Sequence, residues 1–139
     1  MGWRVLFGFV AGFLSVLLVH QTALYVGGRV GFGGGGAWSM APVSHWRIPS
    51  VIVTAALGGL WGVLLVHILP NLGRGLWGAV SAVLIFAVLI SLTNWFVLAP
   101  LLRHGSGFAA STAIYPLVYN GVWAAGALAL LRLTPRAGG

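Results

Sequence analysis

The chain of 139 residues has no Asp, Glu, Lys or Cys, and seven Arg are its only fixed charges. Charged residues make up 5% of the sequence and hydrophobic residues 60%, whereas a soluble domain carries about 25% charged residues. A folded soluble surface cannot be built from so few polar groups. The composition therefore excludes a cytosolic globular enzyme, a disordered chain and a disulfide scaffold, and it indicates an integral membrane protein.

The absent residue types also exclude definite chemistry. Without carboxylates there is no acidic general acid or base and no Mg²⁺ or Ca²⁺ cage, and without Cys there is no thiolate nucleophile or ligand. No Asp or Glu exists to orient a His beside a serine, so no catalytic triad is visible. We predict a protein that is not an enzyme and has no catalytic residue, metal or cofactor. The alternative is a Cu or Zn site built by His20, His45 and His104, but no ligand spacing supports it.

Four apolar runs account for most of the chain. A hydrocarbon core of about 30 Å needs about 20 apolar helical residues, and four Arg-free runs meet this length, at about 5–26, 50–69, 76–99 and 114–131. Pro49 precedes the second run, and Pro70 and Pro100 follow the second and third. The short break after Pro70 predicts that the second and third helices form an antiparallel hairpin. We predict one all-α transmembrane domain, residues 1–139, folded as an antiparallel four-helix bundle.

The connection between the first and second runs is longer than the others. It includes four consecutive glycines at 33–36, typical of a flexible hinge, followed by an aromatic and apolar stretch. One interpretation is a linker that dips Trp38 and Trp46 into the lipid headgroups. The other is a segment that folds back over the bundle, with His45 and Trp46 as a lid.

Small residues form stripes on each predicted helix. Helices in lipid associate through close backbone approach and interhelical hydrogen bonds, so such stripes predict packing faces. A dimer face or a seat for a flat ligand is the alternative. The stripes comprise Gly8, Ala11, Gly12 and Ser15 on the first helix, then the pairs Gly58 and Gly62, Gly78 and Ala82, and Gly121 and Ala125.

Arginines lie near the ends of the apolar runs, where they predict contacts with lipid headgroups. Because the chain has no carboxylate side chain, they need anionic lipids or acidic groups on a partner membrane protein. A homo-oligomer is the alternative assembly. Scattered single Arg argue against nucleic acid as a partner. Four Arg on the side of the termini against three on the other predict cytoplasmic termini in a bacterial inner membrane. The six candidate headgroup contacts are Arg4, Arg29, Arg47, Arg74, Arg103 and Arg132.

Polar side chains inside the runs gather at one depth. Because the helices alternate in direction, the late halves of the first and third runs and the early halves of the second and fourth share one end of the molecule. We name this the loop-one end, because the connection 27–49 lies there. Polar residues inside a membrane indicate function by default. The candidate ligand-binding residues are His20, Gln21, Thr54, Asn94, Trp95, Tyr119 and Asn120.

Two interpretations of this polar group stay open. In the first, it forms a pocket for a small molecule or a lipid headgroup, with hydrogen bonds from His and amide side chains and stacking by Tyr119 or Trp95. In the second, it is a network of interhelical hydrogen bonds that fixes the packing, each worth about 0.6 kcal/mol.

Several short segments of the first half of the chain occur together: His20-Gln21, Trp38-Ser39-Met40-Ala41-Pro42-Val43, Pro49 and Gly58-Gly59-Leu60-Trp61-Gly62. In these segments the chain resembles a group of small bacterial four-span inner-membrane proteins that have no assigned function. The resemblance implies bacterial origin and membrane residence, and it transfers no activity and no site residues.

The sequence favours a non-enzymatic membrane protein that serves as a small structural or accessory subunit and interacts with lipid or with a partner membrane protein. The alternative is a transporter or channel-like protein that binds a small neutral or anionic solute at the loop-one end.

Overall fold

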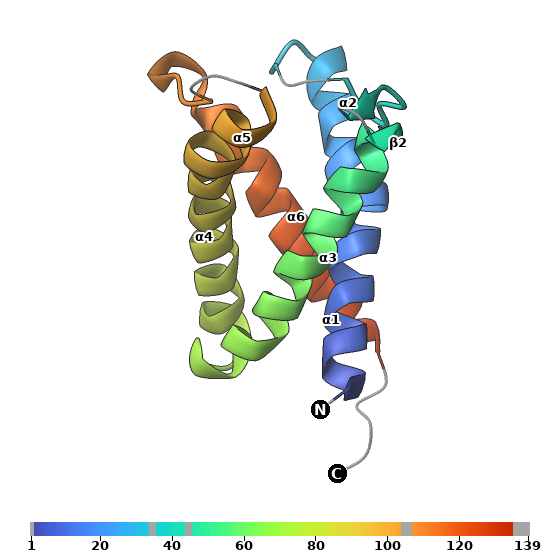
Figure 1. Cartoon of the computed structure of the whole chain (residues 1–139). Helices are drawn as coiled ribbons and strands as arrows, with labels where there is room; N and C mark the ends of the chain where they lie inside the picture. Colours follow the sequence, from blue (N-terminus) through green and yellow to red (C-terminus); the bar gives the residue numbers. More distant parts are fainter. Residues whose placement is uncertain (1, 34–35, 44–45, 104–106, 135–139) are drawn as a thin grey trace.

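The computed structural model describes residues 2–33, 36–43, 46–103 and 107–134, except the side chains of residues 102 and 103. Within this part of the chain, four helical segments are long and apolar enough to cross a membrane: Gly2–Arg29, Ser50–Asn71, Gly75–Leu101 and Ile114–Leu133. Each contains one of the four predicted runs, and the prediction of an all-helical protein is confirmed. Figure 1 shows that the first segment begins and the last segment ends at the same end of the molecule.

Two of the segments contain π-helical turns. The first segment consists of α1 (Gly2–Ser15), the π-helical η1 (Val16–His20) and α2 (Gln21–Arg29). The second consists of α3 (Ser50–Ile68) and the 3₁₀-helical η3 (Leu69–Asn71). The third consists of α4 (Gly75–Thr93), the π-helical η4 (Asn94–Leu98) and α5 (Ala99–Arg103). The fourth is α6 (Ile114–Leu133), preceded by the 3₁₀-helical η5 (Ala110–Thr112).

Pro100 lies inside the third helical segment and does not follow it, which corrects the sequence prediction. The residue belongs to α5, directly after η4. A proline normally interrupts the α-helical ladder because it has no N–H. Here the ladder has already changed to π-type pairing, in which the Ala99 N–H donates to the Asn94 carbonyl oxygen. The helix thus continues past the proline.

The connection after the first segment folds back onto the helices. Its strands β1 (Pro42–Val43) and β2 (Ile48–Pro49) form a short antiparallel pair. The Trp38 indole N–H donates to the Leu17 carbonyl oxygen at 3.0 Å, and the Val51 N–H donates to the Ser39 carbonyl oxygen at 3.0 Å. Of the two interpretations of this segment, the structure agrees with the folded-back one.

Glycines bring α1 and α3 into backbone contact. A Cβ on Gly62 would overlap the carbonyl oxygen of Gly8, and a Cβ on Gly12 would overlap that of Gly58. The predicted stripe on the first helix is buried in full, because Gly8, Ala11, Gly12 and Ser15 are the buried residues of α1. The predicted packing faces of these two helices are therefore confirmed.

The small-residue stripe predicted on α6, Gly121 and Ala125, is not the face of α6 that packs most closely on the first segment. Gly121 is half-buried and faces α4, where a Cβ would meet Ala87 and Val83 at an ordinary contact distance of 3.7 Å, and Ala125 is exposed. Gly126 instead faces the first segment, where a Cβ would meet Ser15 and Val19. The Ser15 hydroxyl donates to the Trp123 carbonyl oxygen at 2.7 Å, and the Trp123 indole N–H donates to the Gly12 carbonyl oxygen at 3.0 Å. These two bonds fix how α6 is rotated against α1.

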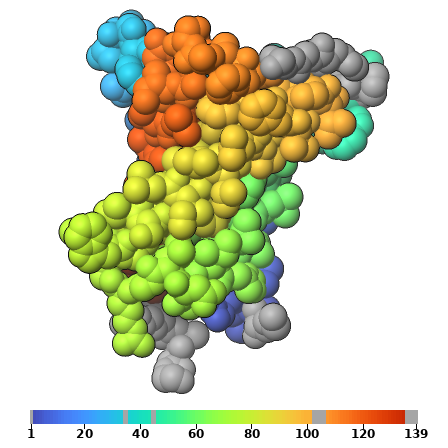
Figure 2. Space-filling view, turned by 90° about the vertical axis from the view of Figure 1, so that its left-hand side faces the viewer, coloured from blue at the N-terminus to red at the C-terminus, as the bar shows by residue number. Residues whose placement is uncertain are grey.

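The helices α3 and α4 diverge, although only a short connection separates them. They start close together at that connection and separate toward the loop-one end (Figure 1). α3 packs on α1 and α4 packs on α6, whereas α3 and α4 meet mainly through side chains such as Trp61 and Phe86. The predicted hairpin is thus wrong beyond its turn, because the glycine contact draws α3 toward α1. Figure 2 shows α4 spread across one face of the molecule, with the α3–α4 connection below it.

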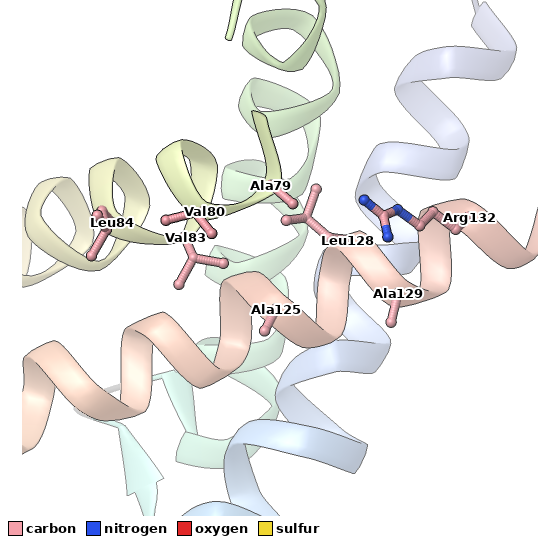
Figure 3. Close-up of a pocket in the computed structure, with 8 residues that line it drawn as sticks. All are labelled: Ala79, Val80, Val83, Leu84, Ala125, Leu128, Ala129 and Arg132. Carbon is pink, nitrogen blue, oxygen red and sulfur yellow. The ribbon is translucent and has the colours of Figure 1, made fainter. Parts of the chain in front are cut away.

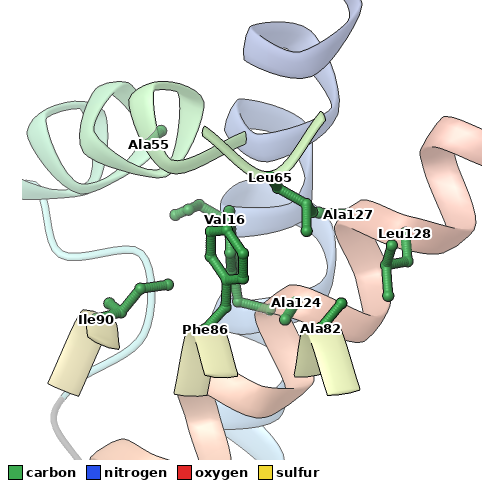
Figure 4. Close-up of a cluster of buried hydrophobic side chains, with 10 residues drawn as sticks. Val16, Ala55, Leu65, Ala82, Phe86, Ile90, Ala124, Ala127 and Leu128 are labelled. Atoms are coloured by element: carbon green, nitrogen blue, oxygen red, sulfur yellow. The ribbon is translucent and has the colours of Figure 1, made fainter. Parts of the chain in front are cut away.

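The buried core lies where the four segments come together. Phe86 of α4 is its largest fully buried side chain, and Leu65 of α3 is also fully enclosed (Figure 4). The Phe86 ring packs edge-on against Trp61, with centroids 6.2 Å apart, and lies 6.3 Å from the Trp123 ring. The core cluster comprises Val16, Ala55, Leu65, Ala82, Phe86, Ile90, Trp123, Ala124, Ala127 and Leu128.

Candidate functional site

A cavity of about 680 Å³ lies at the loop-one end, with α3 on one side and the end of α4 with η4 on the other. All four helical segments and the first connection contribute to its wall. Six of the seven candidate ligand-binding residues line it: His20, Gln21, Thr54, Asn94, Trp95 and Asn120. The structure therefore brings together side chains that are up to 100 residues apart in the sequence.

Tyr119, the seventh candidate, does not line the cavity. Its hydroxyl donates to the carbonyl oxygen of Gly33, and its ring stands edge-on to His20 with centroids 6.2 Å apart. The hydroxyl passes so close to Gly27 that a Cβ there would overlap it. Tyr119 thus joins the first connection to α6 through a hydrogen bond, and its ring packs against the His20 ring.

Part of the polar group is engaged in hydrogen bonds that hold the protein together. The Gln21 side-chain oxygen accepts from the Trp38 N–H at 2.7 Å, and the Asn120 amide donates to the Ser91 hydroxyl at 2.9 Å. The Thr54 hydroxyl donates to the Ser50 carbonyl oxygen one turn earlier at 2.8 Å. The packing network and the pocket are therefore both present, and they share residues.

Other polar atoms of the cavity wall keep free hydrogen-bonding capacity. The His20 ring contacts the Gln21 amide through Nδ1 at 3.5 Å, which leaves Nε2 unused among the described residues. The Asn94 side chain makes no hydrogen bond to any described residue, and Asn120 uses only its amide nitrogen. Because every fully enclosed side-chain N or O in the described part has a partner, these free atoms face accessible space. The cavity can therefore offer donors and acceptors to a ligand.

Both π-helical turns lie at the cavity. His20 is the last residue of η1 and Asn94 is the first of η4, and both line its wall. π-helical turns are rare and occur frequently at functional sites. Sequence reasoning missed them because an added residue in one turn leaves no trace in a continuous apolar run. It also missed Trp61 and Ser50 as wall residues.

The predicted lid is replaced by an earlier part of the same connection. Trp46 is 76% exposed and is not among the residues that line the cavity, and His45 lies outside the described residues. The connection instead covers the cavity with Gly36, Ser39, Pro42 and Val43. The reason is the β1–β2 pair, whose base is joined to the start of α3 while Trp46 lies at its tip.

The arginine side chains that the structure describes lie toward the two ends of the molecule, and none of them lines the cavity. Arg4 donates to the Val66 carbonyl oxygen at 3.1 Å, and the Arg29 guanidinium lies 5.5 Å from the centre of the Tyr25 ring. Arg47, Arg74 and Arg132 are exposed. The Arg103 side chain lies outside the described part.

Metal ligands do not cluster in residues 2–33, 36–43, 46–103 and 107–134, where no three His, Cys, Asp or Glu side chains come together. Of the alternative set of three His, only His20 falls within these ranges.

The Ser91–Asn120 bond gives a first testable prediction. Replacing Ser91 with Ala removes an interhelical bond between α4 and α6, so we expect a loss of about 0.6 to 1.7 kcal/mol of unfolding free energy. Thermal unfolding in detergent measures this loss. Ser81→Ala is the matched control, because Ser81 lies on the same helix and makes no side-chain hydrogen bond to a described residue. Equal melting temperatures for the two variants would show that the bond has no packing role.

Comparison with known proteins identified no relative of this chain. The chain matches no protein-family model, no curated protein and no solved structure.

Proposed function

We propose that the chain is a four-span integral membrane protein that binds a small neutral amphiphile in the cavity at the loop-one end. The observation that carries the proposal is the convergence of polar side chains from every helical segment on one cavity of about 680 Å³. Ligand pockets in proteins have volumes of about 300 to 1,000 Å³. Four helical segments long and apolar enough to span a membrane support the membrane placement.

The cavity wall favours a ligand with a polar head and an apolar body. His20, Asn94 and Asn120 offer hydrogen bonds, whereas Leu57 and Ile90 supply apolar contacts. No Arg is among the described residues that line the cavity. Because an unpaired charge is costly to bury, this wall favours a neutral solute over an anionic one.

The divergence of α3 and α4 supports entry of the ligand from the membrane. Val53 and Leu57 of α3 line one side of the cavity, and Leu98 of η4 lines the other. A neutral amphiphile dissolved in lipid can pass between these apolar side chains and then turn its head toward Asn94. The amphiphile thus reaches the site without crossing the first connection.

An accessory-subunit role is the second candidate, and the charge balance of the chain supports it. The chain has seven Arg and no Asp or Glu, so it needs anionic lipid or an acidic partner to balance its charge. In this proposal the protein resides in a bacterial inner membrane with its termini in the cytoplasm.

Thermal unfolding with a neutral lipid tests the binding proposal. We expect 1-monooleoylglycerol to raise the Tm of the full chain in detergent, because a ligand that binds only the folded state stabilises it. Replacing Asn94 with Leu keeps the side-chain size and removes the free amide. One lost hydrogen bond of about 1.4 kcal/mol weakens binding about tenfold, so the variant needs about ten times more lipid for the same rise.

Thr93→Val is the matched control, because the Thr93 hydroxyl bonds within its own helix to the Leu89 carbonyl oxygen and does not line the cavity. Solvent extraction of the purified wild-type protein, followed by mass spectrometry, should also release a neutral molecule. The proposal fails if the lipid stabilises Asn94→Leu as well as wild type, or if neither the lipid nor the extract shows binding.

A further inference from the structure

A second hollow lies on the outer face of the molecule, away from the loop-one end. It is a groove of about 280 Å³ between α4 and α6. Figure 3 shows apolar side chains of both helices along it and Arg132 at one end. Its residues include Val80, Val83 and Leu84 from α4, and Ala125, Ala129 and Arg132 from α6.

The shape of the groove follows from its alanines. Ala125 and Ala129 lie one turn apart on α6 and are exposed, and their short side chains leave space beside the larger residues of α4. The groove extends from Arg132 toward Ala125, seven residues earlier on the helix, which corresponds to about 10 Å along the axis. This narrow apolar channel suits a single hydrocarbon chain.

Arg132 gives the groove its chemical selectivity. It lies in the last turn of α6, next to the end of the fourth apolar segment, Ile114–Leu133, and its side chain is exposed. No Asp or Glu exists anywhere in the chain to pair with it. A guanidinium binds phosphate oxygens through two parallel hydrogen bonds, and at a membrane boundary the available anion is a lipid phosphate.

From this arrangement we infer that the α4–α6 groove binds one anionic phospholipid, with an acyl chain along Val80, Val83 and Ala129 and the phosphate on Arg132. The positive guanidinium complements the negative headgroup, while the apolar groove matches the chain attached to it. This site is separate from the proposed neutral-ligand cavity, which is lined by none of the same residues.

Native mass spectrometry of the full chain tests the inference. The protein is titrated in detergent with phosphatidylglycerol and, separately, with phosphatidylcholine of the same acyl chains. We expect the first tightly bound phosphatidylglycerol to bind about tenfold better than phosphatidylcholine, because phosphatidylglycerol keeps its net negative charge, whereas the quaternary ammonium of phosphatidylcholine cancels the phosphate charge and is repelled by the guanidinium. Arg132→Gln should remove this tenfold preference.

Arg74→Gln is the matched control, because it removes one exposed guanidinium that is also a predicted headgroup contact but does not line the groove. This variant should keep the preference. Ala129→Phe fills the groove and leaves every Arg in place, so it should weaken binding of both lipids. Thermal unfolding confirms that each variant is folded.

Three results would overturn the inference. Equal losses in Arg132→Gln and Arg74→Gln would mean that general surface charge attracts the lipid. Undiminished binding to Ala129→Phe would mean that the acyl chain does not occupy the groove. Conversion of an oligomer to a monomer by Ala129→Phe, seen by light scattering, would assign the groove to a second copy of the chain.

Discussion

Replacing Gly62 with Ala should destabilise the protein more than any other single-methyl addition on α3. The new Cβ would overlap the Gly8 carbonyl oxygen and would also press on the backbone of Gly12. Backbone atoms cannot rotate away as a side chain can, so α1 and α3 must separate along their contact. Overpacking of this kind costs about 3 kcal/mol, and we expect a matching fall in the unfolding free energy measured in detergent with increasing SDS.

Gly28→Ala is the control for this variant. Gly28 also lies in a helix of the first segment, but a Cβ there would have nothing within 4 Å. It should be neutral or should stabilise the protein by up to about 1 kcal/mol, because Ala has the higher helix propensity. Similar stabilities for Gly62→Ala and Gly28→Ala would show that α1 and α3 are not in backbone contact.

Replacing Phe86 with Ala should have the second large effect, again about 3 kcal/mol. Phe86 is 0% exposed and its ring packs between those of Trp61 and Trp123. In lipid, apolar transfer drives helix association only weakly, so the loss comes from van der Waals contacts that an empty space cannot replace. The Tm in detergent measures the effect.

Leu84→Ala serves as the comparison, because Leu84 lies on the same helix and is 61% exposed. We expect its Tm to stay within a few degrees of that of wild type. Trp61 and Trp123 also line the large cavity, so Phe86→Ala should in addition loosen that wall and reduce the stabilisation by 1-monooleoylglycerol. A Phe86 variant as stable as the Leu84 variant would contradict the buried position of the ring.

The sequence was enough to predict most of the residues that lie at the candidate site. The alternation of helix direction is enough to place His20, Asn94 and Asn120 at the same end of the molecule, whatever the details of packing. The sequence could not predict that the space between His20, Asn94 and Asn120 is open. That space depends on the divergence of α3 and α4, which follows from the contact of α3 with α1.

Errors at single residues have a common physical cause. Tyr119 and Trp46 have the right depth, yet Tyr119 bonds to Gly33 and Trp46 lies at the exposed tip of the β1–β2 pair. Depth depends only on position along a helix axis. The direction of a side chain depends on rotation about that axis and on turns in the connections, which residue spacing does not specify.

The sequence by itself determined the number, approximate position and order of the apolar helices, because hydropathy acts locally along the chain. The small-residue stripes also marked the facing sides of α1 and α3, but only the tertiary structure decided which faces of the other helices meet. α4 and α6 carry hydrophobic residues on every side, so no hydrophobic periodicity marks an inner face. Gly126, and not Gly121, faces the first segment because the side chains of Ser15 and Val19 fill the space beside it, and because two hydrogen bonds join Trp123 to α1.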